Sequence, residues 1–116
     1  MFEIYTKEVE IKEPSGNLVK YKLRPLSGRF LSRVFDIVKV LSKQDIDKTL
    51  SKEEQAKKSF DAFSEDVVNK LHSVVFETLK ASYPKENHEQ LDAFTSQNML
   101  YFMDAVISIN MPDDKQ

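Results

Sequence analysis

The stretch LVKYKLRPLSGRFLSRVFDIV, from Leu18 to Val38, contains the change of pattern that decides the fold. Before Pro25, apolar and charged residues alternate with a period of two, which is typical of a half-buried strand. After Pro25, apolar residues recur every three or four positions, which is typical of a helix with one buried face. Proline cannot donate to a strand ladder and favours extended geometry in the preceding residue, so we place the boundary at Pro25.

A second alternating stretch lies just upstream, and the two together predict a β-hairpin over residues 1–24. Val9 and Ile11 alternate with charged residues over residues 8–12. The linking loop EPSGN, residues 13–17, contains proline, glycine and asparagine, which supply the dihedral angles of a turn. Two strands alone are marginal in water, so the hairpin must pack against the rest of the chain.

Residues 27–110 predict four or five helices, and residues 111–116 predict a flexible tail. Ser27 is expected to cap a first helix that ends near Ser42. The buried face of that helix is predicted from its spacing: Phe30, Val34, Ile37, Val38 and Leu41. The predicted fold class is therefore mainly α (α+β), a single domain in which an N-terminal hairpin packs on a bundle of four to five helices.

The middle of the chain leaves one alternative open. Ser51 and Glu54 have the spacing of a capping box, which marks the start of a helix. No proline or glycine interrupts residues 51–82, so this region forms either one long helix or two helices with a break near Ser64. We expect two, and we place Leu71 of the second in the core together with Phe30.

Two further helices are expected after Pro84. The first covers residues 88–94, and Thr95 or Ser96 caps the second, which Pro112 closes. Both predictions rest on the preference of hydroxyl side chains for the first position of a helix and on the inability of proline to continue one.

The composition excludes several classes of protein. The 116-residue chain has a net charge of −2, no cysteine and only two glycines and two histidines. Disulfides and thiolate metal sites are therefore excluded, and the glycines do not cluster as phosphate-binding loops require. His72 lies among apolar residues and is expected to be partly buried. We expect no enzymatic activity and no cofactor or metal, and the lack of a long apolar run predicts a soluble, cytoplasmic protein.

Charge is distributed unevenly along the chain. Residues 18–43 hold seven basic residues and one acidic residue, whereas residues 83–116 hold six acidic and two basic residues. A basic segment is compatible with nucleic-acid binding, but aromatic residues are not interleaved with these bases. We therefore favour contact between the two segments, within one chain or between copies in a weak homo-oligomer.

The final helix carries one stripe that we predict to bind a partner. It consists of four residues at positions i, i+3, i+4 and i+7: Met99, Phe102, Met103 and Val106. Methionine is flexible and polarizable, so it suits surfaces that accept more than one partner segment. The alternative is that the stripe packs inward, against Val67, Leu71 and Val75, as part of an ordinary core.

Short motifs mark the predicted elements in their order along the chain. The hairpin leads into LRPLS at residues 23–27 and then into the helical FLSRVF at residues 30–35. The chain closes with Asn98 and a helix that ends in ISIN at residues 107–110. In this order, over nearly the whole chain, the sequence resembles the tail assembly chaperones of long-tailed bacteriophages.

The resemblance implies a function without catalysis. Proteins of this family bind the long, helical tape measure protein, keep it soluble and help to recruit tail tube protein, and they leave before the tail is complete. It implies a location in the cytoplasm of the bacterial host and absence from the mature virion. An apolar groove is expected to hold one amphipathic helix of the client. Two alternatives stay open: a structural head–tail connector or tail completion protein, and a small nucleic-acid-binding regulator.

Overall fold

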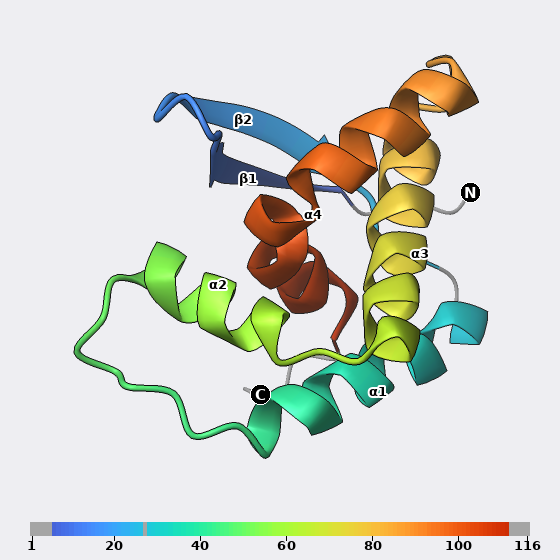
Figure 1. Ribbon diagram of the computed structural model, residues 1–116. Helices are drawn as coiled ribbons and strands as arrows, with labels where there is room; N and C mark the ends of the chain where they lie inside the picture. Colours follow the sequence, from blue (N-terminus) through green and yellow to red (C-terminus); the bar gives the residue numbers. More distant parts are fainter. Residues whose placement is uncertain (1–5, 27, 112–116) are drawn as a thin grey trace.

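The computed structural model describes residues 6–26 and 28–111 (Figure 1). Within these ranges the elements are two strands, a short 3-10 helix (Gly28–Phe30) and four α-helices: β1 (Lys7–Lys12), β2 (Leu18–Leu23), α1 (Leu31–Ser42), α2 (Lys52–Asp61), α3 (Glu65–Ser82) and α4 (His88–Asn110). The predicted α+β class, a hairpin followed by four to five helices, is confirmed. The predicted Ser27 cap and the tail beyond Met111 lie outside the described residues.

The hairpin has the face that the alternating pattern predicts. Val9 lies opposite Tyr21, and both side chains pack against the core. At the turn, the Glu13 N–H donates to the Asn17 carbonyl oxygen over 2.8 Å, and Gly16 adopts a φ of 94°. Glycine reaches this left-handed geometry without a steric cost, so the turn is tight and holds the two strands in register.

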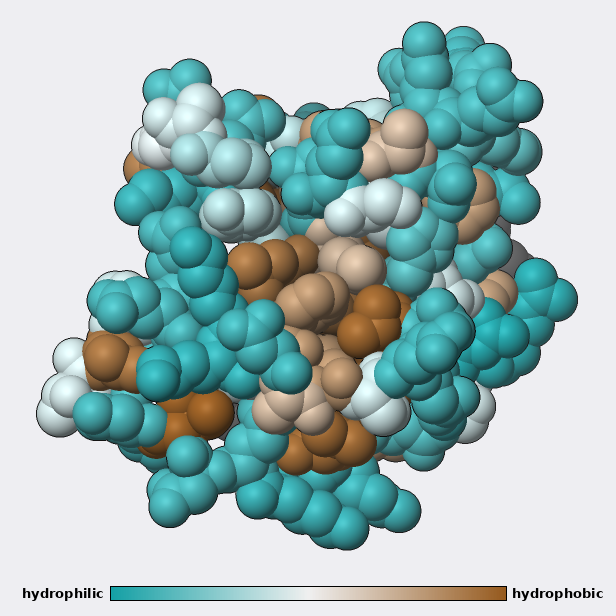
Figure 2. Space-filling view, viewed as in Figure 1, coloured by the Kyte–Doolittle hydropathy of each residue, from teal (hydrophilic) through white to brown (hydrophobic). Residues whose placement is uncertain are grey.

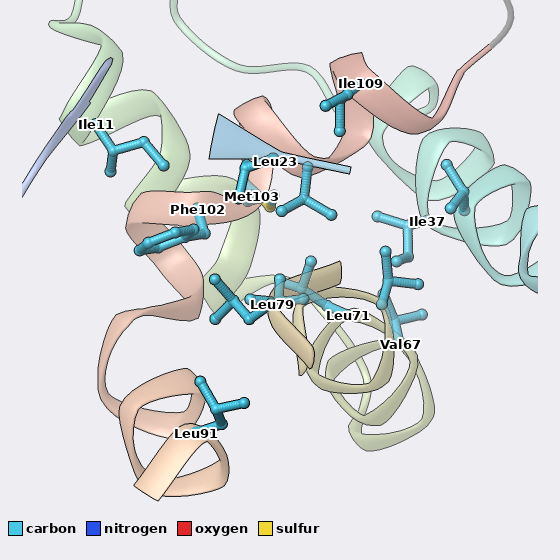
Figure 3. Packing of buried hydrophobic residues seen from close by; sticks show 14 residues of the cluster. Ile11, Leu23, Ile37, Val67, Leu71, Leu79, Leu91, Phe102, Met103 and Ile109 are labelled. Atoms are coloured by element: carbon cyan, nitrogen blue, oxygen red, sulfur yellow. The ribbon is translucent and has the colours of Figure 1, made fainter. Parts of the chain in front are cut away.

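The core lies where the inner face of the hairpin meets α1, α3 and α4. Figure 3 shows side chains converging from these parts of the chain, among them Leu23 from β2, Ile37 from α1 and Leu71 from α3. Most of the buried residues belong to α3 and α4, which pack against each other. Apolar burial contributes about 25 cal/mol per Å². The helices therefore supply the stability that a two-stranded hairpin lacks.

One residue that the spacing places in the core, Phe30, lies outside it. Its ring is partly exposed, and the guanidinium groups of Arg29 and Arg33 lie 4.9 Å and 5.3 Å from the ring centre. The reason is that Phe30 ends a separate turn of 3-10 helix, so it does not share the buried face of α1. Leu71, in contrast, is fully buried as predicted.

The predicted break near Ser64 is confirmed. The Ser64 hydroxyl oxygen accepts from the Val67 N–H over 3.3 Å and so caps α3. Ser51 caps α2 in the same way, because its hydroxyl oxygen accepts from the Glu54 N–H over 3.2 Å. Each cap satisfies a backbone donor that the first turn of a helix leaves without a partner, so residues 51–82 form two helices.

The two helices predicted after residue 84 are one, which corrects that prediction. Thr95 is not a cap: it lies inside α4, and its hydroxyl donates to the Leu91 carbonyl oxygen over 2.7 Å. The Asn98 side chain donates to the Phe94 carbonyl oxygen in the same helix over 2.9 Å. Side-chain bonds to the carbonyl four residues back are associated with bent helices. Figure 1 shows that the axis of α4 turns about halfway along its length.

Candidate partner-binding groove

The predicted partner-binding stripe on α4 is buried, which corrects that prediction. The exposed fractions of Phe102, Met103 and Val106 are 1%, 2% and 0%, and Met99 is partly buried. The first three belong to the same buried cluster as Leu71 of α3 (Figure 3). The alternative interpretation, inward packing, is therefore the one that the structure supports. An apolar stripe at helical spacing has the same sequence pattern in both cases.

An open apolar groove lies on another side of α4, between β1 and α2. Its volume is about 280 Å³. Five apolar residues line it: Ile11, Ala56, Leu100, Tyr101 and Ala105. Figure 2 shows apolar side chains gathered in a hollow at the centre of this face, over α4, with hydrophilic residues around them. We call this feature the β1–α2–α4 groove.

Charged side chains form the rim of the β1–α2–α4 groove. Glu10 and Lys12 come from β1, and Lys52, Glu53 and Asp104 come from α2 and α4. The Lys12 ammonium lies 3.8 Å from the Glu53 carboxylate, so an exposed ion pair links β1 to α2. An apolar centre with a polar rim is the usual anatomy of a protein–protein contact.

The outer edge of β2 is closed at its C-terminal end by side chains of α3 and the turn after it. The Lys22 N–H donates to the Tyr83 hydroxyl oxygen over 3.1 Å. The Arg24 N–H, just beyond the strand, donates to the Ser82 hydroxyl oxygen over 2.9 Å. These two outward-facing donors therefore have partners within the chain, so the β2 edge is closed at its C-terminal end.

The last residue of α4 continues this closure. The Asn110 side-chain oxygen accepts from the Leu26 N–H over 2.6 Å. The Asn110 amide nitrogen donates to the Val106 carbonyl oxygen over 2.8 Å and to the Thr78 hydroxyl oxygen over 3.3 Å. Because Asn110 is buried, its polar atoms depend on these partners. Asn110 thus joins the segment after β2 to both long helices, a role that its sequence context does not reveal.

A second apolar pocket, of about 380 Å³, lies on this closed side of the hairpin. Aromatic and aliphatic side chains from β2, α3 and α4 line it, among them Tyr21, Tyr83 and Phe94. The Tyr21 ring packs edge-on against Phe102, with ring centres 5.0 Å apart. The pocket therefore adjoins the core. In the strand beside it, the Lys22 N–H is already bonded to the Tyr83 hydroxyl oxygen.

The outer edge of β1, which borders the β1–α2–α4 groove, is open. In an antiparallel pair, successive residues direct their backbone N–H and C=O groups toward and away from the partner strand. The Lys22 N–H points away from β1, so Glu8, which lies opposite it, points away from β2. The same alternation turns Glu10 and Lys12 outward. Among residues 6–26 and 28–111, these outward groups have no hydrogen-bond partner.

Ion pairs do not join the basic segment to the acidic one in the described part of the chain. Lys70 instead links α3 to α1, because its ammonium lies 2.9 Å from the Asp36 carboxylate and 3.1 Å from that of Asp66. The hydrogen bond from Lys70 lowers the pKa of Asp36 below its ordinary value of 3.8, and the bond to Asp36 raises the pKa of Lys70. Within the described residues the two segments thus meet through hydrogen bonds such as that from the Lys22 N–H to Tyr83 and not through ion pairs, and contact between copies stays a prediction.

Basic side chains gather around a third pocket, of about 580 Å³. Arg24, Arg29, Lys80 and His88 line it, together with one acidic residue, Glu77. They come from the segment after β2, the 3-10 helix, α3 and the start of α4. The fold therefore brings part of the basic segment beside bases from farther along the chain, which linear spacing did not reveal.

His72 is partly buried, as its apolar neighbours predict. Its Nε2 lies 3.0 Å from the Asp92 carboxylate, and its ring stacks on Phe76. Within the described residues, no group of three histidine or acidic side chains is placed to hold a metal ion.

Comparisons with protein-family profiles, with curated proteins and with solved structures found no match for the chain. Among the described residues, no helix has both the length and the apolar character needed to cross a membrane. The β1–α2–α4 groove is thus the feature on which a functional argument rests, because it combines an open apolar surface with an open strand edge.

Proposed function

We propose that the protein is a phage tail assembly chaperone that binds the tape measure protein, keeps it soluble and helps to bring tail tube protein to it. The observation that carries the proposal is the β1–α2–α4 groove, an apolar surface open to solvent in a small chain with many charged residues. The order of elements that resembles this family supports the same function.

The physical requirements of such a chaperone fit the groove. A client segment must be held strongly enough to prevent aggregation and weakly enough to be released when the tail assembles. A groove with a small apolar floor and an exposed rim provides modest apolar burial, and rim charges add little net energy. The charged outer face of the hairpin keeps the complex soluble.

Co-expression with the tape measure protein encoded by the same genome tests the proposal. Leu100 lines the groove without belonging to the packed core, so Leu100→Asp places a charge on the apolar floor. We expect the parent chain to keep the tape measure protein in the soluble fraction and Leu100→Asp to lose this effect. Leu18→Asp is the matched control, since Leu18 is 62% exposed and lies outside the groove. Equal solubilisation by the parent and both variants would contradict the role of the groove.

The composition of the virion separates this function from that of a structural connector. A chaperone of this kind acts in the host cytoplasm and leaves before the tail is complete. We expect the chain in lysates of infected cells and not in purified virions, as measured by mass spectrometry. A stoichiometric amount in the virion would instead assign the chain to the head–tail connector or tail completion class.

The basic pocket favours one second candidate, a nucleic-acid-binding regulator. Arg24, Arg29 and Lys80 surround one pocket and have no ion-pair partner within residues 6–26 and 28–111. If these residues bind phosphates, affinity for duplex DNA falls steeply with added salt and falls further in Arg29→Glu. Absence of DNA binding at low salt would eliminate this candidate.

A further inference from the structure

We propose that the β1–α2–α4 groove takes its client as an extended segment that adds to the open edge of β1 as a third strand, with apolar residues alternating with basic ones. The proposal rests on the proposed function for the role of the groove, and it names the form and the chemistry of the segment that binds there. It replaces the amphipathic helix that the family resemblance suggests.

Hydrogen bonding at the β1 edge favours a strand as the occupant. The outward N–H and C=O groups of Glu8, Glu10 and Lys12 have no partners in the described residues. Glu10 and Lys12 also line the groove, so an apolar segment laid in the groove would remove part of this edge from water. A buried donor or acceptor without a partner is costly. A helix satisfies its own backbone and would leave these groups without partners, whereas an added strand bonds to them directly.

The position of the apolar floor determines which residues of the bound segment are apolar. A strand added to β1 lies about 4.8 Å from it and directs every second side chain to each face. Ile11 is the residue of β1 whose side chain points to the inner face and also lines the groove. The inner side chains of the added strand therefore lie beside Ile11, over Leu100 and Tyr101 of α4. This arrangement requires apolar residues at every second position of the client.

The charges on the outer face of the hairpin determine the other residues of the bound segment. On the outer face of the hairpin, β1 already pairs two glutamates with lysines of β2: Glu8 lies opposite Lys22, and Glu10 lies opposite Lys20. An added strand would face the same two glutamates from the other side. Opposite charges at facing positions stabilise a strand pair, and like charges destabilise it. The outer positions of the client that face Glu8 and Glu10 are therefore basic.

The same rule disfavours a second copy of β1 as the occupant. Two copies of β1 would pair across a two-fold axis in antiparallel registers that keep the apolar faces on one side. In one of the two longest of these registers Glu10 faces Glu8, which gives two glutamate pairs, and in the other Glu10 faces Glu10 while Glu8 faces Lys12. A glutamate thus opposes a glutamate in both, whereas a strand with basic outer residues places an opposite charge beside Glu8 and Glu10 alike. The observations thus favour a different chain with basic outer residues.

Binding of two synthetic peptides tests the proposal. The probe Thr-Val-Lys-Val-Lys-Val-Thr has the predicted pattern, and Thr-Val-Glu-Val-Glu-Val-Thr has the same apolar residues with reversed charge. We expect the basic peptide to bind at least about tenfold more tightly in titration calorimetry, since two facing pairs change from attraction to repulsion. Binding should also slow amide hydrogen exchange at Glu8, Glu10 and Lys12.

Two variants at one position separate backbone bonding from side-chain contact. Glu10→Pro removes an outward N–H and leaves the ladder to β2 intact, because proline is tolerated where the strand N–H faces solvent. Glu10→Ala removes the same carboxylate but keeps the N–H. We expect Glu10→Pro to lose detectable peptide binding and Glu10→Ala to retain it at reduced affinity, with parent-like circular dichroism for both.

Several outcomes would overturn strand addition: equal affinity for both peptides, equal binding by the two Glu10 variants, or no change in exchange at Glu8, Glu10 and Lys12. A homodimer that Glu10→Pro abolishes, without peptide binding by the parent, would assign the edge to a second copy and also overturn it. If the peptide binds as expected but the tape measure protein stays insoluble on co-expression, the proposed function fails and strand addition stands. If Leu100→Asp abolishes solubilisation and Glu10→Pro does not, the proposed function stands and strand addition fails.

Discussion

The two edges of the hairpin differ, although the two strands have similar alternating sequences. The β2 edge is closed at its C-terminal end and just beyond it, since the N–H groups of Lys22, Arg24 and Leu26 donate to side chains of Tyr83, Ser82 and Asn110. In the part of the chain that the structure describes, the β1 edge has no partner, and it borders a groove. Edge strands left unpaired are a liability that proteins normally cover or charge. The closed edge therefore serves stability, and the open one is available for binding.

The two sides of the hairpin also differ in how they are attached to the helices. Its inner face contributes Ile11 and Leu23 to the core, which fixes it to α4 and α3. On the closed side, hydrogen bonds to Tyr83 and Ser82 fix the orientation of the hairpin, because hydrogen bonds are directional and apolar contact is not. On the open side, one exposed ion pair between Lys12 and Glu53 spans from β1 to α2, and such pairs contribute little.

The largest expected effect distinguishes the buried face of α4 from the face that lines the groove. Met103 is buried in the core, and Leu100, three residues earlier, lines the open groove. Met103→Asp buries a charge without a partner, so we expect a loss of at least about 3 kcal/mol in the free energy of unfolding, or no folded protein. Leu100→Asp should cost less than about 1 kcal/mol. Urea denaturation followed by circular dichroism measures both, and equal losses would contradict the difference between the sides.

The next effect tests the closure at Asn110. Asn110→Ala removes the acceptor of the Leu26 N–H and the donor to Thr78, and we expect a loss of about 1–3 kcal/mol because these groups are partly or fully buried. Asn98→Ala is the matched control on the same helix, since the Asn98 side chain bonds to a carbonyl oxygen of α4 alone. It should change the free energy of unfolding by less than about 0.5 kcal/mol. A similar loss in both variants would show that Asn110 acts through α4 alone.

The sequence predicts the elements better than it predicts their surfaces. The hairpin, the turn at Gly16 and the break at Ser64 follow from local rules, namely alternation, turn residues and capping, and the structure confirms them. The continuity of α4 does not follow, because Thr95 is equally suited to a cap and to a bond with the carbonyl four residues back.

The candidate site lies beyond local rules. The pattern placed the α4 stripe correctly on one face, but burial depends on what packs there, and Met103 faces the core. The groove is built from Ile11, Ala56 and Leu100, which lie far apart in the chain. Which edge of the hairpin stays open depends on which strand Tyr83 contacts. This is a tertiary contact that neither the hairpin sequence nor the sequence around Tyr83 indicates.

A smaller effect concerns the hydroxyl that closes β2. Tyr83→Phe keeps the ring but removes the acceptor of the Lys22 N–H, and we expect a loss of about 0.5–1 kcal/mol because this bond is exposed. Amide hydrogen exchange at Lys22 should become faster. In the control Tyr101→Phe, a groove residue, exchange at Lys22 should stay unchanged. If exchange at Lys22 is the same in the parent and Tyr83→Phe, the β2 edge is not closed by this hydroxyl.

The smallest effect is a pH dependence confined to the closed side. Burial raises the pKa of Tyr21 above its ordinary value of 10.0, and the nearby Glu13 carboxylate, which accepts from the Tyr21 hydroxyl over 3.4 Å, raises it further. The folded state thus favours the neutral phenol. Its contribution to stability is complete below pH 10 and is lost as the pH rises through the raised pKa of the folded state.

Denaturation of the parent and of Tyr21→Phe at a series of pH values from neutral to above 10 measures this contribution. The variant lacks the titrating group, so its stability should fall less steeply above pH 10, while other tyrosines and lysines affect both proteins alike. Glu13→Gln should fall between the two, because it removes the carboxylate and keeps the burial. Parallel curves for the parent and Tyr21→Phe would mean that water reaches the Tyr21 hydroxyl freely. The Tyr21 hydroxyl on the closed side would then be as accessible to water as the groups on the open side.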